Sequence, residues 1–168
     1  QTYDVSMECT HHGPTDLGAP GMFVELGSGE TQWKDPAGAE AVARSILDLE
    51  GVRPGADRTL VAFGGSHYAP KPTRIVTETA FSVGHVAADW SLEAMGDPEE
   101  HEELIQSMFE KSDAECAVID GEYPEIETLV RNLGYRVKSE TWVRETSGYD
   151  PALIEDLEVA LGTVEEGL

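Results

Sequence analysis

Basic residues, cysteines and long apolar runs are all scarce in this chain of 168 residues. Lysine and arginine together number 11, against 33 aspartates and glutamates, and only two cysteines are present. The longest apolar runs, such as residues 59–63, are far too short to span a bilayer. No charged segment followed by an apolar one opens the sequence, so nothing marks it for secretion. We therefore expect a cytoplasmic protein without a membrane partner.

The shortage of basic residues leaves a formal net charge of −22. At ordinary ionic strength such a charge opposes compaction through self-repulsion. In molar salt the Debye length falls to about 3 Å, and the repulsion nearly vanishes. The acidic residues are spread through segments with folded patterns and are not collected in a tail, which favours a cytosolic protein of an extreme halophile. The alternative is an acidic protein that docks onto a basic partner.

The same acidity limits binding to nucleic acids. Proteins that bind duplexes are normally basic, and high salt weakens contacts with phosphates because counterion release drives much of that affinity. We therefore expect no binding to DNA. Recognition of a single-stranded end held in a small pocket stays compatible with this composition.

Short apolar runs alternate with helical patterns along the chain, which is typical of an α/β domain. Asp35 and Pro36 form the start signal of a helix, whose buried face should carry Ala41, Val42, Ile46 and Leu47. Strands are predicted at 3–9, 22–27, 60–63, 81–86, 117–119 and 135–137, and helices at 36–50, 72–79, 98–111, 124–133 and 151–161. We expect a three-layer domain with a mixed, largely parallel sheet.

No second-domain boundary is visible, so residues 1–168 are predicted to form a single α/β catalytic domain. The chain opens on Gln1, and a strand-like pattern begins almost at once. This start suggests the C-terminal part of a longer protein.

Two loops with histidines directly follow predicted strands, and ligands of α/β sheets bind beyond the carboxyl ends of strands. The first is Glu-Cys-Thr-His-His-Gly-Pro-Thr at 8–15 and the second is Gly-Gly-Ser-His-Tyr-Ala-Pro-Lys at 64–71. We expect both loops to share one rim. Their side chains, with one glutamate from the second predicted strand, form a nitrogen, oxygen and sulfur set suited to zinc: Glu8, Cys9, His11, His12, Glu25 and His67.

Adjacent histidines are not a common metal spacing, because successive strand residues point to opposite faces. Only a loop conformation lets the rings of His11 and His12 converge. Two alternatives stay open. The histidines can act as acid and base, since imidazole titrates near neutrality, or they can simply shape the loops through hydrogen bonds to the backbone. The two thiols lack a CxxC spacing, and buried free thiols are the default.

The second loop also offers groups for binding a substrate. Gly64 and Gly65 permit close backbone approach, and free amides there could stabilise an oxyanion. Lys71 stands out because lysine is scarce, and its ammonium can hold a phosphate as a point charge; a solvated surface residue is the alternative. Tyr68 and Thr73 could donate hydrogen bonds to a substrate or pin the loop.

Four blocks of this sequence together resemble the archaeal and plant type D-aminoacyl-tRNA deacylase family. They are residues 8–15, Phe-Val-Glu-Leu-Gly-Ser at 23–28, residues 64–71, and Phe-Ser-Val-Gly-His at 81–85. Order and spacing agree from about Tyr3 to the end of the chain. Cys9 departs from the small aliphatic residue expected there, and family members carry additional sequence before the first block.

The resemblance implies a fold similar to peptidyl-tRNA hydrolase and nucleoside phosphorylases, and a zinc-dependent activity. The implied reaction hydrolyses the ester between a D-amino acid and the tRNA 3′ end. His11, His12, His67 and Glu25 are then the expected catalytic residues, and His11, His12, His67 and Glu8 the expected zinc ligands. Gly64, Gly65, Tyr68, Lys71 and Thr73 would contact the terminal adenosine and its phosphate. The protein is expected to be a monomer.

Two other hypotheses are compatible with the sequence. The same site could serve a metallohydrolase acting on a small amide or ester, or an activity like that of peptidyl-tRNA hydrolase. Alternatively, the domain is a non-catalytic binding module in which the histidines shape loops.

Overall fold

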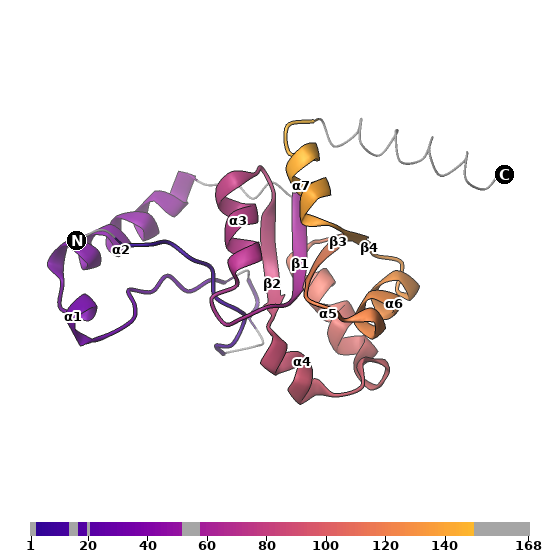
Figure 1. Ribbon diagram of the computed structural model, residues 1–168. Helices are drawn as coiled ribbons and strands as arrows, with labels where there is room; N and C mark the ends of the chain where they lie inside the picture. Colours follow the sequence, from indigo (N-terminus) through magenta and orange to yellow (C-terminus); the bar gives the residue numbers. More distant parts are fainter. Residues whose placement is uncertain (1–2, 14–16, 20, 52–57, 150–168) are drawn as a thin grey trace. The chain divides into compact units, whose positions relative to one another are not determined.

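The computed structural model describes residues 3–13, 17–19, 21–51 and 58–149 (Figure 1). The chain divides into a smaller unit of residues 1–5 and 12–54 and a larger unit of residues 6–11 and 55–168. The helix predicted at 151–161 lies outside the described residues. Within those residues, none of the helices is both long and apolar enough to cross a membrane.

The larger unit is built on a sheet of four strands in the order β2-β1-β3-β4, and every neighbouring pair is parallel. The strands are β1 (Thr59–Gly64), β2 (Ser82–Ala87), β3 (Cys116–Asp120) and β4 (Arg136–Lys138). The predicted α/β class is confirmed. The sheet expected to be mixed is wholly parallel in the described part of the chain. Because parallel neighbours require a long crossover connection, helices separate the strands in sequence.

The helices of the larger unit cover both faces of this sheet. Val61 and Phe63 of β1 point into one hydrophobic core, whereas Leu60 and Ala62 point into another. The first core receives side chains from α4 (Asp89–Met95), α5 (Glu102–Ser112) and α6 (Pro124–Asn132), and the second from α3 (Pro70–Glu78) and α7 (Glu140–Thr146). The helix–sheet–helix arrangement gives the three layers that the sequence predicts.

The predicted long helix at 98–111 is in fact two elements, a 3-10 turn, η3 (Pro98–His101), and α5. Ile105 and Phe109 are fully buried, as expected for the inward face of an amphipathic helix. The apolar pattern of this segment predicts that Leu104 also points inward, and this prediction is wrong because its side chain is 49% exposed. Successive residues of a helix are rotated by about 100°, so Leu104 lies at the edge of the stripe centred on Ile105.

The smaller unit contains α1 (Glu30–Trp33), α2 (Pro36–Asp48) and a 3-10 turn, η1 (Leu49–Gly51). The predicted start of α2 is confirmed: Asp35 accepts a hydrogen bond from the Ala37 backbone N–H at 3.0 Å. The same carboxylate accepts a 2.6 Å hydrogen bond from the Tyr3 hydroxyl. The predicted buried face is wrong, because Ile46 is 50% and Leu47 75% exposed.

Two predicted strands are also wrong, since neither described stretch, 3–9 or 22–27, pairs into a sheet. Val5 is 81%, Met22 67% and Phe23 60% exposed. An alternating or apolar run becomes a strand only where a neighbour accepts its backbone hydrogen bonds, and the sequence pattern does not reveal such a neighbour.

An ion pair between α3 and α7 makes stability depend on pH. Arg74 donates two hydrogen bonds of 2.9 Å to the Glu140 carboxylate, and these bonds lower the pKa of Glu140 from 4.5 to about 2. A depressed carboxyl pKa adds stability that is present above the unfolded pKa and is lost as pH falls through the folded pKa.

We expect Glu140→Gln to lower the free energy of unfolding by roughly 1–2 kcal/mol at pH 7, because hydrogen bonds to charged groups are lost. The difference from the unmodified chain should shrink as pH falls from about 5 to about 2. Urea denaturation in molar KCl measures it, with Glu145→Gln on the same helix as the control. A difference that stays constant across this pH range would contradict the assignment.

Candidate functional site

Residues 6–11 of the larger unit run past the carboxyl ends of β1 and β2. The Cys9 backbone N–H donates to the His67 carbonyl at 2.8 Å, and the Thr10 N–H donates to the Val86 carbonyl at 2.8 Å. The Thr10 hydroxyl oxygen accepts a 3.1 Å hydrogen bond from the Val86 N–H. These bonds place the first histidine loop beside the second, at the sheet edge where the sequence predicts them to meet.

Four side chains of these loops converge, which we call the His11–His67 cluster: Glu8, Cys9, His11 and His67. The two imidazole centroids lie 4.6 Å apart at an interplanar angle of 61°. Both Nε2 atoms face the same Glu8 carboxylate oxygen, at 3.8 Å for His11 and 3.5 Å for His67. Both Nδ1 atoms face the Cys9 sulfur, at 3.9 Å and 3.5 Å respectively. The carboxylate and the thiol therefore lie on opposite sides of the ring pair.

Hydrogen bonding fixes the protonation of one ring. His11 Nδ1 is 2.7 Å from the Cys9 carbonyl oxygen, which can only accept, so this nitrogen carries the proton. In the neutral ring, Nε2 is then the basic nitrogen, and it faces Glu8. The side chains of His11 and His67 are 22% and 41% exposed, so a substrate can reach both rings.

The Cys9 thiol differs from its neighbours because it is only 3% exposed. Burial, together with the nearby Glu8 carboxylate, raises the pKa of Cys9. The thiol is therefore protonated at neutral pH unless a cation stabilises its thiolate.

The donor set of the cluster suits zinc. Ligand atoms of Cys9, His11 and His67 lie within 4.8 Å of one another. Zinc bonds of about 2.0–2.3 Å place tetrahedral ligand atoms about 3.5 Å apart, so the three side chains would have to move slightly inward to hold an ion. Glu8 supplies an oxygen on the Nε2 side. Cys9 is thus a candidate ligand, as in the donor set predicted from the sequence, although the zinc ligands that the family resemblance implies do not include it.

His12 and Glu25 belong to the smaller unit and pair with each other. His12 Nε2 lies 3.2 Å from Glu25 Oε1, and the two side chains are 44% and 50% exposed. The His12 ring also contacts Phe23, with centroids 4.8 Å apart. The sequence prediction that both residues are catalytic stays a prediction.

The groups predicted to bind substrate have other partners in the structure. The Gly65 N–H donates to Asp89 Oδ1 at 2.6 Å, so this amide is already used. The Lys71 ammonium donates to the Ile119 carbonyl at 2.6 Å and lies 3.3 Å from Asp120 Oδ1. Its side chain is only 18% exposed, which places its charge at the end of β3.

Thr73 and Tyr68 are also among the residues predicted to bind substrate, and only Tyr68 lies beside the histidine rings. The Thr73 hydroxyl oxygen accepts a 2.9 Å hydrogen bond from the Met7 N–H, which pins the first loop. Tyr68 is 53% exposed, and its ring lies edge-on to the His67 imidazole with centroids 5.1 Å apart. Tyr68 is thus well placed to contact a substrate held at His67.

Sequence reasoning missed a second set of polar groups at the same edge. Asp89 Oδ1 accepts hydrogen bonds from the Gly65 N–H and from the Tyr123 hydroxyl, both at 2.6 Å. The Tyr123 hydroxyl donates to this carboxylate, which raises the pKa of Tyr123 to about 12. Asp89 is the second residue after the end of β2, and Asp120 is the last residue of β3. A position at the carboxyl end of a strand is where ligands of α/β sheets bind, so both aspartates could have been found from the predicted strands.

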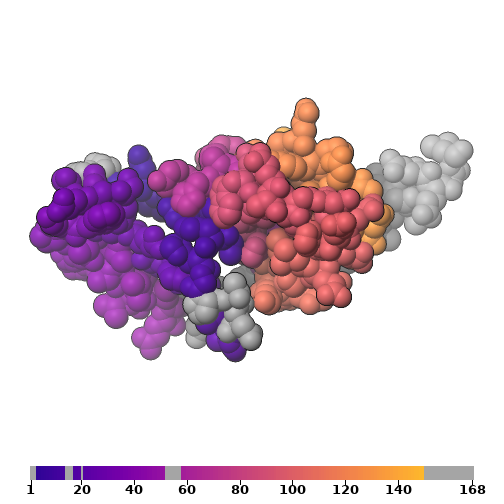
Figure 2. Space-filling view, turned by 90° about the horizontal axis from the view of Figure 1, so that it is seen from below, coloured from indigo at the N-terminus to yellow at the C-terminus, as the bar shows by residue number. Residues whose placement is uncertain are grey.

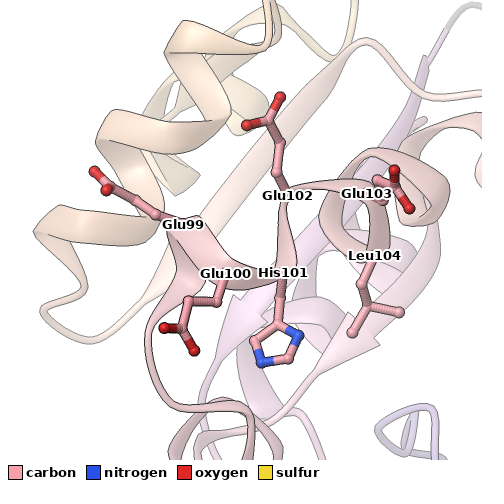
Figure 3. A pocket seen from close by; sticks show the side chains of 6 residues that line it. All are labelled: Glu99, Glu100, His101, Glu102, Glu103 and Leu104. Carbon is pink, nitrogen blue, oxygen red and sulfur yellow. The ribbon is translucent and has the colours of Figure 1, made fainter.

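The acidic run at 99–103 does not build a convergent site. Figure 3 shows the side chains of the glutamates and His101 that line a pocket here, and they point in different directions. Residues 89–112 also cover much of the face of the larger unit seen in Figure 2. The sequence of this run lacks the loop spacing that an EF-hand needs and predicts a solvated surface, which agrees with that arrangement.

Fold and site together define a class: a three-layer α/β protein with histidine, cysteine and carboxylate groups gathered at the carboxyl edge of a parallel sheet. The sequence profile of the D-aminoacyl-tRNA deacylase family matches residues 1–138. The chain therefore belongs to the D-aminoacyl-tRNA deacylase family.

Curated relatives with the name D-aminoacyl-tRNA deacylase cover nearly the whole chain. The chain is 55% identical to one from Halobacterium salinarum and 51% identical to one from Natronomonas pharaonis, each over 99% of its length. Both are halophilic archaea, as the composition predicts. A relative from Methanosarcina barkeri is 40% identical over 87% of the chain.

A solved structure shares the fold. The crystal structure of a conserved protein of unknown function, AF0625, superposes with a TM-score of 0.73 at 32% identity over 83% of this chain and 50% of that one. The chain also spans only 37%, 38% and 47% of the three curated relatives.

The close approach of β1 and β3 at this edge requires glycine at residue 64. Its φ is +87°, and an added Cβ would lie 2.2 Å from the Asp120 carbonyl oxygen and 2.7 Å from the Tyr123 ring. Gly134, with a φ of +89°, has no atom within 4 Å of such a Cβ.

We expect Gly64→Ala to lower the free energy of unfolding by at least about 3 kcal/mol, because left-handed strain and a backbone clash add together. Gly134→Ala, the matched control, should cost only the strain of about 1–2 kcal/mol. Urea denaturation in molar KCl measures both variants. Equal losses would show that the approach of Asp120 does not constrain residue 64.

Proposed function

We propose that this chain carries the hydrolytic site of a D-aminoacyl-tRNA deacylase, which cleaves the ester between a D-amino acid and the tRNA 3′ end in translation quality control. The convergence of His11 and His67 on Glu8 is the observation that carries this proposal. Family membership supports the substrate class. The single-stranded acceptor end is also the kind of nucleic acid that so acidic a chain can bind, since it requires few phosphate contacts.

The cluster suits the hydrolysis of an activated ester. A water held at the basic Nε2 of one imidazole attacks the ester carbonyl, and that nitrogen takes the proton. A new carbon–oxygen bond to the water forms, and the bond from the carbonyl carbon to the ribose oxygen breaks. An imidazolium then returns the proton to the ribose oxygen. Glu8, which faces both Nε2 atoms, orients the rings during this exchange.

We also propose zinc as the cofactor, held by Cys9, His11 and His67, with Glu8 orienting the two rings from the Nε2 side. Binding of the ion on the Cys9 side would displace the proton from His11 Nδ1. Bound zinc would polarise a carbonyl and lower the pKa of a coordinated water. His12 and Glu25, as a second histidine–carboxylate pair, enter the proposal as additional catalytic groups. We further propose a monomeric, cytoplasmic protein that does not bind DNA.

Deacylation of D-tyrosyl-tRNA and L-tyrosyl-tRNA in molar KCl tests the function. We expect rapid hydrolysis of the D-ester only, and His67→Ala should reduce its rate by about 100-fold or more, since general acid–base groups contribute roughly 10²–10⁴-fold. His101→Ala, on the acidic surface run, is the control and should leave the rate unchanged. Equal, slow hydrolysis of both esters would overturn the proposal and favour a small-ester hydrolase.

Metal analysis tests the cofactor separately. We expect stoichiometric zinc in the unmodified chain and loss of most of it in Cys9→Ser, because a hard hydroxyl is a poor replacement for thiolate. Cys116→Ser, which changes the other buried cysteine, should retain the metal. Zinc content unaffected by either change would place the metal elsewhere or exclude Cys9 as a ligand.

A further inference from the structure

A groove of about 690 Å³ lies at the carboxyl ends of β3 and β4 and includes the start of α6 in its wall. Its volume is within the range of about 300–1,000 Å³ that is typical of small-molecule sites. Ile119 and Tyr123 contribute apolar and aromatic surface, and Arg131 and Lys138 contribute positive charge. None of these groove residues takes part in the chemistry proposed above.

The groove adjoins the His67 loop along the same sheet edge. Lys71, four residues after His67, donates its 2.6 Å hydrogen bond to the carbonyl of Ile119, which lines the groove. β3 is the direct neighbour of β1, and β4 follows it. Because adjacent strands are about 4.8 Å apart, the groove begins about one strand spacing beyond the loop that carries His67.

The charge of the groove contrasts with that of the chain. The chain carries −22, but the groove balances two cations, Arg131 and Lys138, against two carboxylates, Glu122 and Glu127. Arg131 Nη2 lies 2.7 Å from Glu127 Oε1. Between groove and cluster, Lys71 offsets Asp120. The Asp89 carboxylate also lies at this edge, where the Gly65 N–H and the Tyr123 hydroxyl donate to it. A phosphate chain that follows the edge would therefore meet carboxylates that are mostly hydrogen-bonded or paired with a cation.

Two aromatic residues hold the groove in shape. The Tyr123 ring is fixed by the hydrogen bond of its hydroxyl to Asp89. The Lys138 ammonium lies 4.3 Å from the centroid of the Trp142 ring, an arrangement that orients the cation. Aromatic surface with adjacent cations is the usual equipment of sites for single-stranded nucleic acid, and base stacking tolerates any sequence.

We propose that this groove binds the nucleotides that precede the terminal adenosine of the tRNA acceptor end. Lys138 contacts a phosphate, and Tyr123 supports a base. This inference rests on the proposed function, because it requires the aminoacyl ester to lie at the His11–His67 cluster. It adds a binding site that holds the polynucleotide while the cluster holds the reacting end.

Binding of two hydrolysis-resistant probes tests the inference. The first is 3′-amino-3′-deoxyadenosine with D-tyrosine in amide linkage, and the second is the same nucleoside extended by two 5′ cytidylates. Isothermal titration calorimetry in molar KCl gives both dissociation constants. We expect the extended probe to bind at least about tenfold tighter, and Lys138→Gln to remove most of that gain while leaving the nucleoside probe unaffected. The salt dependence of the extended probe should lose about one unit of slope.

Matched variants separate this role from a structural one. Lys138→Arg keeps the charge and should retain most of the gain. Lys111→Gln removes a lysine at the end of α5, just before β3 begins, and thus at the opposite edge of the sheet; it should change neither affinity. Cytidylates that add no affinity, or a Lys138→Gln effect that is equal on both probes, would overturn the inference alone. Failure of the nucleoside probe itself to bind would instead overturn the proposed function.

Discussion

The site depends on the hydrogen bonds that tie residues 9 and 10 to the carboxyl ends of β1 and β2. The Cys9 N–H to His67 carbonyl bond brings the two histidine loops together. The paired bonds between Thr10 and Val86 hold the first loop against the sheet. Because His11 immediately follows Thr10, the position of its ring depends on these backbone contacts. The parallel sheet thus provides the rigid edge, and the short segment of residues 6–11, which is not part of the sheet, provides Glu8, Cys9 and His11 of the cluster.

Cys9 is a buried residue whose thiol nevertheless faces the polar His11–His67 cluster. Its thiol closes the Nδ1 side of the two imidazoles while Glu8 closes the Nε2 side. Burial raises the pKa of Cys9, which favours a neutral thiol without a cation and a thiolate with one. The same geometry therefore suits a hydrogen-bonded acid–base pair and a zinc site, and the proposed function uses both properties.

The sequence alone was sufficient for the three-layer α/β class and for the meeting of two loops at one edge, because buried strands and helix caps such as Asp35 have strong local signals. It predicted a mixed, largely parallel sheet, whereas the described sheet is wholly parallel. It was insufficient where burial depends on distant partners. The sequences around Val5 (residues 3–9) and Phe23 (residues 22–27) have the pattern of strands, but neither stretch pairs with a sheet in the structure. Ile46 and Leu47 fit an amphipathic stripe but are exposed. For Cys9 a buried free thiol was the default, although the residue was also part of the predicted donor set. That two imidazoles face its sulfur depends on the meeting of two distant loops.

The central claim is that His11 and His67 work as one unit, and a double-mutant cycle on the single-turnover rate tests it most directly. Side chains that share one reaction step have strongly non-additive effects when they are removed. Our account predicts that the double variant His11→Gln, His67→Gln hydrolyses D-tyrosyl-tRNA about as slowly as the slower single variant. Losses that multiply, so that the double variant is slower by the product of the two single effects, would contradict it.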